Sequence, residues 1–574
     1  MYFKLLAYLG RYKKQAILSP IAVTGEVILE IYIPFLMAKI VDVGIAQKDL
    51  KYVVETGLLM IGAALLSLAC GSAAARFAAV AATGFSKEIR KAVFNKIQDF
   101  SFSNTDKFST ASLITRLTTD ITFVQNSFMM IIRALVRSPL MLISATLMAV
   151  RINSELALVF LVAIPFLGTA LAVMSIKAHP YFLKMFEKYD AINSSLQEML
   201  TAVRVVKAFV REEYENKKFN DAVTDLKNAQ KTAEKIVILN MPVMNFAMQA
   251  CLICIVWFGG NLIVQGKMQT GELFSFLTYI GMILMSLMMI SMVFIGIIIS
   301  QASAKRICEV LSEIPGIKDT GKDGLVPQDG SIIFENVSFS YSGRAENLTL
   351  KDISLNIRSG ETIGVIGATG ASKTTFVQLI PRLYEAFSGR ILIGGHEIAE
   401  YHLPVLRSAV AMVLQNNLLF SGTIADNLRW GDETASMEEL QAACQAAQAH
   451  EFILSFPQGY DTVLGQGGVN VSGGQKQRLC LARALLKKPK ILILDDSTSA
   501  VDTATDQNIR TALKDQLKET TKIIIAQRIS SIMTADRIIV LEDGTINGIG
   551  THDELMKNNE IYRDIFISQQ KGAA

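Results

Sequence analysis

Glycine and hydroxyl residues surround one lysine in a segment whose spacing is typical of phosphate binding. The segment reads Gly367-Ala-Thr-Gly-Ala-Ser-Lys-Thr-Thr375, after the apolar run 362–366 and before the helical run 376–380. In such a strand-loop-helix unit, backbone N–H groups at the helix N-terminus wrap phosphate oxygens. Lys373 can then neutralise the β and γ oxygens, and the Thr374 hydroxyl can bind Mg²⁺. The residues expected to hold a nucleotide here are Gly367, Thr369, Gly370, Ala371, Ser372, Lys373, Thr374 and Thr375.

One position of this loop departs from the usual pattern, which has a glycine immediately before the lysine. Here that position is Ser372. If the backbone at this point needs a positive φ or a very close approach to phosphate, a Cβ costs about 1 kcal/mol. We therefore expect weakened nucleotide binding. The alternative that the chain binds no nucleotide and acts only as a structural partner stays open.

A second glycine-rich segment carries the most specific pattern in the chain. It reads Val471-Ser-Gly-Gly-Gln-Lys-Gln-Arg478, in which Ser472 and the amides of Gly473 and Gly474 can form an anion site at a helix N-terminus. This segment resembles the LSGGQ signature of the ATP-binding cassette (ABC) transporters. The resemblance spans nearly the whole chain and is to the bacterial exporter-type half-transporters, which have six membrane spans followed by one cassette.

The resemblance implies a role for further residues and identifies the ligands as ATP and Mg²⁺. Tyr341 is expected to stack on adenine, Gln415 to contact Mg²⁺ or the attacking water, and Asp495, at the end of the apolar run 491–494, to hold Mg²⁺. The signature residues expected to contact the γ-phosphate held by another subunit are Ser472, Gly473, Gly474 and Gln475. The implied metal ligands are Thr374, Gln415 and Asp495.

The sequence lacks the two hydrolytic side chains that the family usually has. Asp496 stands where a glutamate normally follows the Mg²⁺-binding aspartate, and Gln527 stands where a histidine is normal. The aspartate side chain is one methylene shorter, and a misplacement of ~1 Å can cost ~100-fold in rate. An amide can donate a hydrogen bond to a γ-phosphate, but it cannot carry a proton as imidazole can. The chain's own site is therefore expected to be weakly hydrolytic.

These departures predict an unequal pair of subunits. ABC cassettes work head to tail, so that each ATP site joins one chain's phosphate loop to the other chain's signature. A homodimer of this chain would have two poor sites. We therefore expect a heterodimer with a second half-transporter that supplies the missing glutamate and histidine, while the intact signature 471–475 completes the partner's hydrolytic site.

Apolar runs long enough to cross the ~30 Å hydrocarbon core of a membrane recur before residue 305. Hydrophobic residues make up 51% of the 574 residues and charged residues only 19%, which indicates a membrane domain. The six expected spans are 16–38, 54–82, 128–150, 156–176, 236–264 and 274–299. The long connections after the second and fourth spans are rich in Lys and Arg, so the positive-inside bias predicts that both termini and the nucleotide-binding part are cytosolic. We expect a multi-pass protein of the cell (inner or plasma) membrane, in contact with membrane lipid.

The composition of the sequence changes at about residue 306. There a polar linker leads into short β-type runs that alternate with helical stretches. The predicted fold class is therefore an all-α six-helix transmembrane domain followed by an α/β P-loop ABC nucleotide-binding domain. The predicted limits are 1–14 for an interfacial elbow helix, 15–305 for the transmembrane domain with long cytosolic loops, 306–330 for the linker and 331–574 for the nucleotide-binding domain. A net charge of +4 without a basic stripe argues against a nucleic-acid partner.

No motif specifies the transported substrate. The resemblance implies export of hydrophobic or amphipathic small molecules, with multidrug efflux as the favoured class, and a lipid or peptide exporter or an ATP-gated channel or regulatory subunit as alternatives. Glu26 and Glu30 interrupt the first span, where an ionisable group is costly unless it faces a cavity or a partner. They are candidate cavity residues, with simple ion pairing or interfacial placement as the alternative.

Overall fold

The computed structural model of the chain describes residues 2–497 and 500–571 and divides into two compact units, each described here by itself. The first unit combines the chain up to Gln98 with Thr110–Glu313. The second combines the short segment Asp99–Ser109 with the chain from Ile314 onward.

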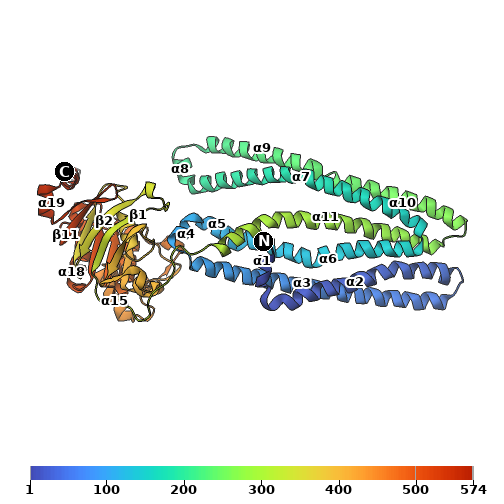
Figure 1. Cartoon of the computed structure of the whole chain (residues 1–574), viewed down its shortest axis with the longest axis horizontal. Helices are drawn as coiled ribbons and strands as arrows, with labels where there is room; N and C mark the ends of the chain where they lie inside the picture. The colour runs from blue at the N-terminus through green and yellow to red at the C-terminus, as the bar shows by residue number, and fades with distance from the viewer. Residues whose placement is uncertain (1, 498–499, 572–574) are drawn as a thin grey trace. The chain divides into compact units, whose positions relative to one another are not determined.

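The first unit is entirely helical in its described part (Figure 1). Its helices are α1 (Tyr2–Leu5), η1 (Leu6–Tyr12), α2 (Lys13–Lys39), η2 (Ile40–Ile45), α3 (Leu50–Gln98), α5 (Thr110–Thr115), η3 (Arg116–Asp120), α6 (Ile121–Ile152), α7 (Ser154–Thr201), α8 (Val203–Ala208), α9 (Glu212–Val237), α10 (Asn240–Val264) and α11 (Thr270–Ser312). Among the described residues, six continuous helical segments are long and apolar enough to cross a membrane: Leu6–Ile45, Leu50–Gln98, Thr110–Ile152, Ser154–Thr201, Glu212–Val264 and Thr270–Ser312. The predicted six-helix membrane part is confirmed, and its helices extend well beyond the apolar runs.

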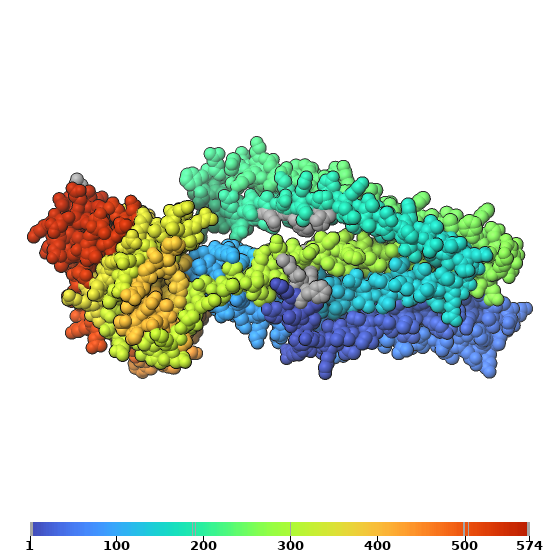
Figure 2. Space-filling model, viewed as in Figure 1, coloured from blue at the N-terminus to red at the C-terminus, as the bar shows by residue number. Residues whose placement is uncertain are grey.

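The membrane helices pack in two groups. Helix α2 packs along α3 and α6, and α6 packs along α11. Helices α9 and α10 run along α7, and Figure 1 shows these three side by side. Figure 2 shows open space between α7 and α11 near α8, so the α7–α9 pair leaves the other helices over part of its length. This arrangement exposes apolar side chains of the pair that no other part of the first unit covers.

The second unit is built on sheets. Its strands are β1 (Ile332–Phe339), β2 (Leu350–Ile357), β3 (Thr362–Ile366), β4 (Ser388–Ile393), β5 (His396–Glu397), β6 (Val410–Val413), β7 (Gly422–Thr423), β8 (Val463–Leu464), β9 (Ile491–Asp495), β10 (Thr521–Ile525), β11 (Arg537–Glu542) and β12 (Thr545–Gly550). A six-stranded sheet has the order β12-β11-β3-β10-β9-β6, and a separate antiparallel sheet has the order β2-β1-β4-β5. The two short strands β7 and β8 pair with each other.

Helices cover the sheets of the second unit. They are α4 (Phe102–Lys107), η4 (Ala345–Asn347), α12 (Lys373–Leu379), η5 (Ile398–Glu400), α13 (Leu403–Ala409), α14 (Ile424–Arg429), α15 (Met437–Ala446), α16 (His450–Leu454), η6 (Gly459–Asp461), η7 (Gln466–Gly468), α17 (Gly473–Leu486), α18 (Thr503–Gln516), η8 (Ile529–Ser531), α19 (His552–Asn558) and α20 (Glu560–Lys571). Phe376 of α12 is fully buried and stacks on Phe334 of β1 with ring centroids 4.8 Å apart. This contact belongs to the core between the two sheets, and the predicted α/β class of this part is confirmed.

Parallel pairing at the centre of the larger sheet decides where its loops lie. Strand β10 pairs in parallel with both β3 and β9, and β9 pairs in parallel with β6. The carboxyl ends of these strands therefore lie at one edge of the sheet, where ligands of open α/β sheets usually bind. The phosphate loop, Asp495, Asp496 and Gln527 follow the ends of β3, β9 and β10 and so meet at this edge.

A charged cluster holds the segment before β1 against the sheet unit. His402 precedes α13, and its Nδ1 and Nε2 atoms lie 3.1 Å from carboxylate oxygens of Asp319 and Asp323, respectively. Gly321 allows this close approach, because a Cβ there would lie 2.1 Å from the His402 backbone nitrogen. The neighbouring ion pair of Lys322 with Glu400 adds a further link.

We predict that this attachment depends on pH. Hydrogen bonds from the imidazole to Asp323 and Asp319 raise the pKa of His402 above its usual value, because both ring nitrogens can donate only in the imidazolium form. The stabilisation is full below the unfolded pKa of about 6.5 and is lost as pH rises through the raised folded pKa. At low pH, hydrogen exchange of residues 317–325 in the full chain should therefore be slower in the wild type than in His402→Ala. At high pH the two rates should become equal, because the wild type loses this protection.

The same experiment has a clear contrary result. If the ratio of exchange rates between the wild type and His402→Ala is constant from pH 5.5 to 8.5, the imidazolium does not hold this segment.

Candidate functional site

The phosphate loop has the backbone geometry of an anion cradle. It leaves β3 at Ile366, and Lys373 is the first residue of α12. Gly370 has φ of 90° and Ser372 has φ of 68° with ψ of 24°, which is the left-handed region. Lys373 Nζ donates to the carbonyl oxygens of Gly367, at 2.8 Å, and Ala368, at 2.9 Å, so its side chain lies across the loop. The positive φ that would make Ser372 costly is therefore present.

The basic and acidic groups of the site face one another. Burial lowers the pKa of Lys373, and the nearby charges of Asp495 and Asp496 oppose this effect. Burial raises the pKa of Asp495, while a hydrogen bond from the Thr374 side chain lowers it. Lys373 is thus held by the loop carbonyls and lies near the charges of Asp495 and Asp496.

Asp495 has the properties of a cation ligand. Only 2% of its surface is exposed, and its Oδ2 atom is buried without a hydrogen-bond partner among the described residues. A buried carboxylate oxygen without a donor is costly, and a bound Mg²⁺ would satisfy it. With the Thr374 hydroxyl beside it, Asp495 fits the oxygen-rich coordination that Mg²⁺ prefers, which phosphate oxygens and water would complete.

The two residues that replace the expected glutamate and histidine bind each other. Gln527 Nε2 donates to Asp496 Oδ2 at 2.8 Å. Asp496 has φ of 48°, and its backbone N–H donates to the carbonyl of Ile525 at 3.0 Å, which fixes the turn after β9 against β10. On its other side, the Gln527 carbonyl accepts a hydrogen bond from Gln569 Nε2 at 2.7 Å. The carboxylate of Asp496 thus accepts a hydrogen bond from an amide, a group that cannot exchange a proton.

Tyr341 and Gln415 flank the loop differently. Tyr341 follows β1, its hydroxyl lies 3.0 Å from Thr375 Oγ1, and the residue is 53% exposed, as a stacking platform beside the loop requires. Gln415 comes after β6, beyond β9 in the sheet order, and is exposed. Their predicted contacts with adenine and with Mg²⁺ or water stay predictions.

The signature segment is a well-formed helix start. Ser472 is the N-cap of α17; its backbone N–H donates to Gln475 Oε1 at 2.8 Å, and its Oγ accepts from the Gln475 N–H at 3.3 Å. A Cβ on Gly474 would lie 2.7 Å from the Ala500 carbonyl oxygen, so the glycine is sterically required. Among the described residues, no hydrogen bond or ion pair links 472–475 to the loop 367–375. One copy of the chain therefore leaves the two halves of the predicted site separate.

Further residues beside the site were not found from the sequence. Tyr384 contacts the Tyr341 ring edge to face, with centroids 5.2 Å apart, and its hydroxyl donates to Asp106 Oδ2 of α4 at 2.7 Å. Phe102 of α4 also meets the Tyr384 ring, at 5.8 Å. Burial and the hydrogen bond with Asp106 raise the pKa of Tyr384. Nothing in the sequence pairs Asp106 with Tyr384, which lies 278 positions away.

The α4 segment is also hydrogen-bonded to the segment that leads into β1. Asn104 Oδ1 accepts from the Gly316 N–H at 2.8 Å, and its Nδ2 donates to the Ile314 carbonyl at 3.0 Å. Together with Tyr384, these bonds join α4 to Tyr341, the residue predicted to stack on adenine. A shift of Tyr341 can thus reach α4 through two ring contacts and one hydrogen bond.

Comparison with known proteins agrees with both halves of the chain. The family model for the ABC transporter transmembrane region matches residues 16–304, and the model described as ABC transporter matches residues 350–499. The chain is 40% identical over 568 residues to the uncharacterized ABC transporter ATP-binding protein YfiB of Bacillus subtilis (strain 168), covering 99% of this chain and 98% of YfiB. It is 33% identical over 478 residues to the ATP-dependent lipid A-core flippase of Syntrophus aciditrophicus (strain SB), covering 83% of this chain and 79% of the flippase.

A solved structure has the same fold over nearly the full length. It is the structure of a bacterial Atm1-family ABC exporter with ATP bound, which aligns with a TM-score of 0.81 and 25% identity. The alignment covers 98% of this chain and 99% of the exporter chain. The order of six apolar helices followed by the nucleotide-binding sheets is shared.

Replacing Ser372 by glycine should tighten nucleotide binding. Removal of a Cβ from a left-handed position relieves about 1 kcal/mol, which corresponds to about fivefold in Kd for a fluorescent ATP analogue with Mg²⁺. Ser372→Ala keeps the Cβ and should bind no more tightly than the wild type. Equal or weaker binding by Ser372→Gly would show that the serine costs nothing.

Replacing Tyr384 by phenylalanine should loosen α4 and leave the ring contacts with Tyr341 intact. Loss of one hydrogen bond costs about 1 kcal/mol, so hydrogen exchange of residues 101–109 in the full chain should rise about fivefold. Asp106→Asn keeps an acceptor oxygen and should have a smaller effect. Unchanged exchange in Tyr384→Phe would exclude this bond as the attachment of α4.

Proposed function

Because the chain belongs to the ABC transporter family, with its transmembrane and nucleotide-binding parts in one polypeptide, we propose that it is the weakly hydrolytic half of a heterodimeric exporter. Membership of this family, six apolar helices and the exporter fold together indicate a multi-pass membrane protein that is part of an ATP-hydrolysing transporter. The observation that carries the finer proposal is the hydrogen bond between Gln527 and Asp496.

The chain's own site is built to bind ATP. Lys373 and the loop amides would hold the phosphates, and Thr374 and Asp495 would hold Mg²⁺. Held there, Mg²⁺ would supply positive charge against the negative charge that develops on the phosphate oxygens. The left-handed Ser372 weakens this binding without abolishing it, since the cost of about 1 kcal/mol is small beside the many phosphate contacts.

Hydrolysis in this site is expected to be slow for two reasons. Asp496 is one methylene shorter than glutamate, so its carboxylate lies farther from a water in line with the γ-phosphate. Its Oδ2 also accepts the hydrogen bond from Gln527, and an amide in that place can neither take up nor release a proton at neutral pH. The pair holds its geometry but lacks an efficient general base.

Other features support a partner with its own hydrolytic residues. The signature helix start is intact and separate from the chain's own loop, so it is available to a second cassette. The tip of the α7–α9 pair around α8 carries exposed apolar side chains, with Phe209 74% and Val210 80% exposed. Exposed apolar groups that lie together mark an interaction surface, and a second cassette is the partner that we propose for this tip.

The transported compound is proposed to be amphipathic, with multidrug efflux as the favoured class. ATP binding would close the two cassettes, and the cytosolic helix ends would transmit this closure to the spans. A lipid substrate is the second candidate, because a relative that shares 33% identity is named a lipid A-core flippase. Transport of fluorescent drugs or lipids into inverted vesicles distinguishes the two.

Restoring the two missing side chains should create activity in the chain alone. The double variant Asp496→Glu with Gln527→His should raise the steady-state Mg-ATPase rate of the chain purified in lipid by about 10- to 100-fold. Asp496→Asn is the matched control and should stay at the basal rate. Robust activity of the unaltered chain by itself would contradict the weakly hydrolytic assignment and favour a working homodimer.

The same chain should activate a complementary half-transporter. Co-expressed with one that has the catalytic glutamate, it should give ATPase activity that Ser472→Ala lowers at least about tenfold, since that serine would contact the partner's γ-phosphate. Ser436→Ala removes the same kind of capping box from α15 and controls for the loss of a helix cap. Equal ATPase activity of Ser472→Ala and Ser436→Ala would exclude a role of this chain's signature segment in the partner's ATP site.

A further inference from the structure

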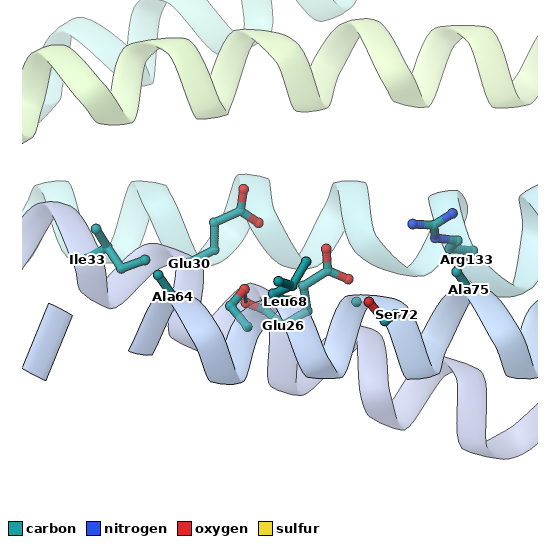
Figure 3. A pocket seen from close by; sticks show the side chains of 10 residues that line it. Glu26, Glu30, Ile33, Ala64, Leu68, Ser72, Ala75 and Arg133 are labelled. Carbon is teal, nitrogen blue, oxygen red and sulfur yellow. Dashed lines mark hydrogen bonds between the residues drawn. The ribbon is translucent and has the colours of Figure 1, made fainter. Parts of the chain in front are cut away.

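A pocket between the first three membrane segments carries both signs of charge. It has a volume of about 430 Å³ and is lined by Glu26 and Glu30 of α2, Ser67 and Ser72 of α3, and Arg133 of α6 (Figure 3). All five lie in the first unit. The remaining lining residues are small or aliphatic, and none is aromatic.

The two carboxylates share one cation. Arg137 Nη2 lies 2.6 Å from Glu30 Oε2 and 3.7 Å from Glu26 Oε1. The Glu26 side chain is only 13% exposed, and its Oε2 atom is buried without a hydrogen-bond partner among the described residues. One guanidinium thus faces two carboxylates, and Glu26 keeps an unused acceptor.

Gly71 is what allows the carboxylate of Glu26 to lie in this position. A Cβ at Gly71 would lie 3.0 Å from both Cδ and Oε1 of Glu26, so any larger residue would press on the carboxylate. The Ser67 hydroxyl on the same helix donates to the Glu26 backbone carbonyl at 3.5 Å and not to the carboxylate. The terminal torsion of glutamate is soft, and the acceptor can turn toward a donor in the pocket.

Arg133 stands at the other end of the pocket. Figure 3 shows it beside Ala75, whereas Glu30 lies toward Ile33 and Glu26 lies between them. Within the part of the chain that the structure describes, no hydrogen bond or ion pair engages Arg133. An unpaired charge within a membrane span is costly and marks a substrate or ion site more often than a structural position.

Taken together, the pocket offers an acceptor for a cation at Glu26 and a donor for an anion at Arg133. We infer that it binds a zwitterionic amphiphile with a primary ammonium, held by Glu26, and a phosphate, held by Arg133. A guanidinium suits phosphate because its N–H groups form a planar fork. A primary ammonium fits Glu26 because it has N–H donors, whereas a quaternary ammonium has none and is usually held by aromatic faces, which this pocket lacks.

This inference rests on the proposed export function and narrows its substrate class. A simple cationic drug would leave Arg133 unpaired, and a simple anion would leave the Glu26 acceptor unused. The same headgroup chemistry can come from a phospholipid or from a soluble amino phosphate, and the binding test below separates the two sources.

The test is competitive binding to the purified full chain in detergent, read by native mass spectrometry. Phosphatidylethanolamine should bind about tenfold more tightly than phosphatidylcholine or phosphatidylglycerol with the same acyl chains, and than hexadecylamine. Phosphatidylcholine lacks N–H donors, phosphatidylglycerol lacks the ammonium and hexadecylamine lacks the phosphate. Equal binding of any of these three would overturn the zwitterion assignment.

Variants locate the site. Glu26→Gln and Arg133→Gln should each reduce the preference for phosphatidylethanolamine about tenfold, and Glu55→Gln, an exposed carboxylate of α3 paired with Lys51, should not change it. A preference that survives both pocket variants would overturn the assignment. The lipid comparison on the wild type needs no variant and keeps the test decisive if a variant misfolds.

Competition by soluble phosphoethanolamine distinguishes a phospholipid ligand from a soluble amino phosphate. Much weaker binding than that of the lipid supports a lipid ligand, equally tight binding supports a soluble zwitterion at the same site, and no competition at any concentration would overturn headgroup recognition. The ATPase of the chain with its partner is measured on the same preparation. Headgroup preference without ATPase would refute the proposed function alone, and ATPase without preference would refute the pocket alone.

Discussion

The parallel pairing of β3, β10 and β9 is the constraint on which the nucleotide site depends. Because these strands run in the same direction, their carboxyl ends deliver the phosphate loop, Gln527 and the two aspartates to one edge of the sheet. The strands are buried on both faces, so this register is fixed by the core. Changes of side chain at the edge therefore alter chemistry without altering the position of the backbone that carries them.

The contact between Asp496 and Gln527 keeps the two replaced positions of the site in a fixed arrangement. The hydrogen bond links the two side chains, and the turn after β9 is held to β10 by a backbone bond. In the proposed heterodimer, a site that binds ATP but hydrolyses it slowly would keep the cassettes closed for longer than an efficient site. One half would then hold nucleotide while the other half hydrolyses it.

Charge has a different cost in each unit. At the surface of the second unit, His402 and its two carboxylates stay in water, and their attraction is modest. In the first unit, Arg137 lies beside two glutamates in a membrane helix, where an unpaired charge costs much more free energy. The close packing that Gly71 permits sets the geometry of this cluster. A ligand that supplies the missing partners would therefore gain more there than the same contacts would give at a surface.

The sequence by itself determined the six apolar helices, the α/β nucleotide-binding part, the order of the motifs and the two chemical departures at 496 and 527. These features are local, because hydropathy, glycine spacing and side-chain type act within one segment. Only the tertiary structure decided that Ser372 is left-handed, that Asp496 and Gln527 bond to each other, and that Tyr384 meets Asp106 across 278 positions. It also decided that Glu26 both shares Arg137 with Glu30 and lines a pocket with Arg133. Such pairs depend on how distant elements pack, and side-chain packing between elements leaves no periodic signal in either segment.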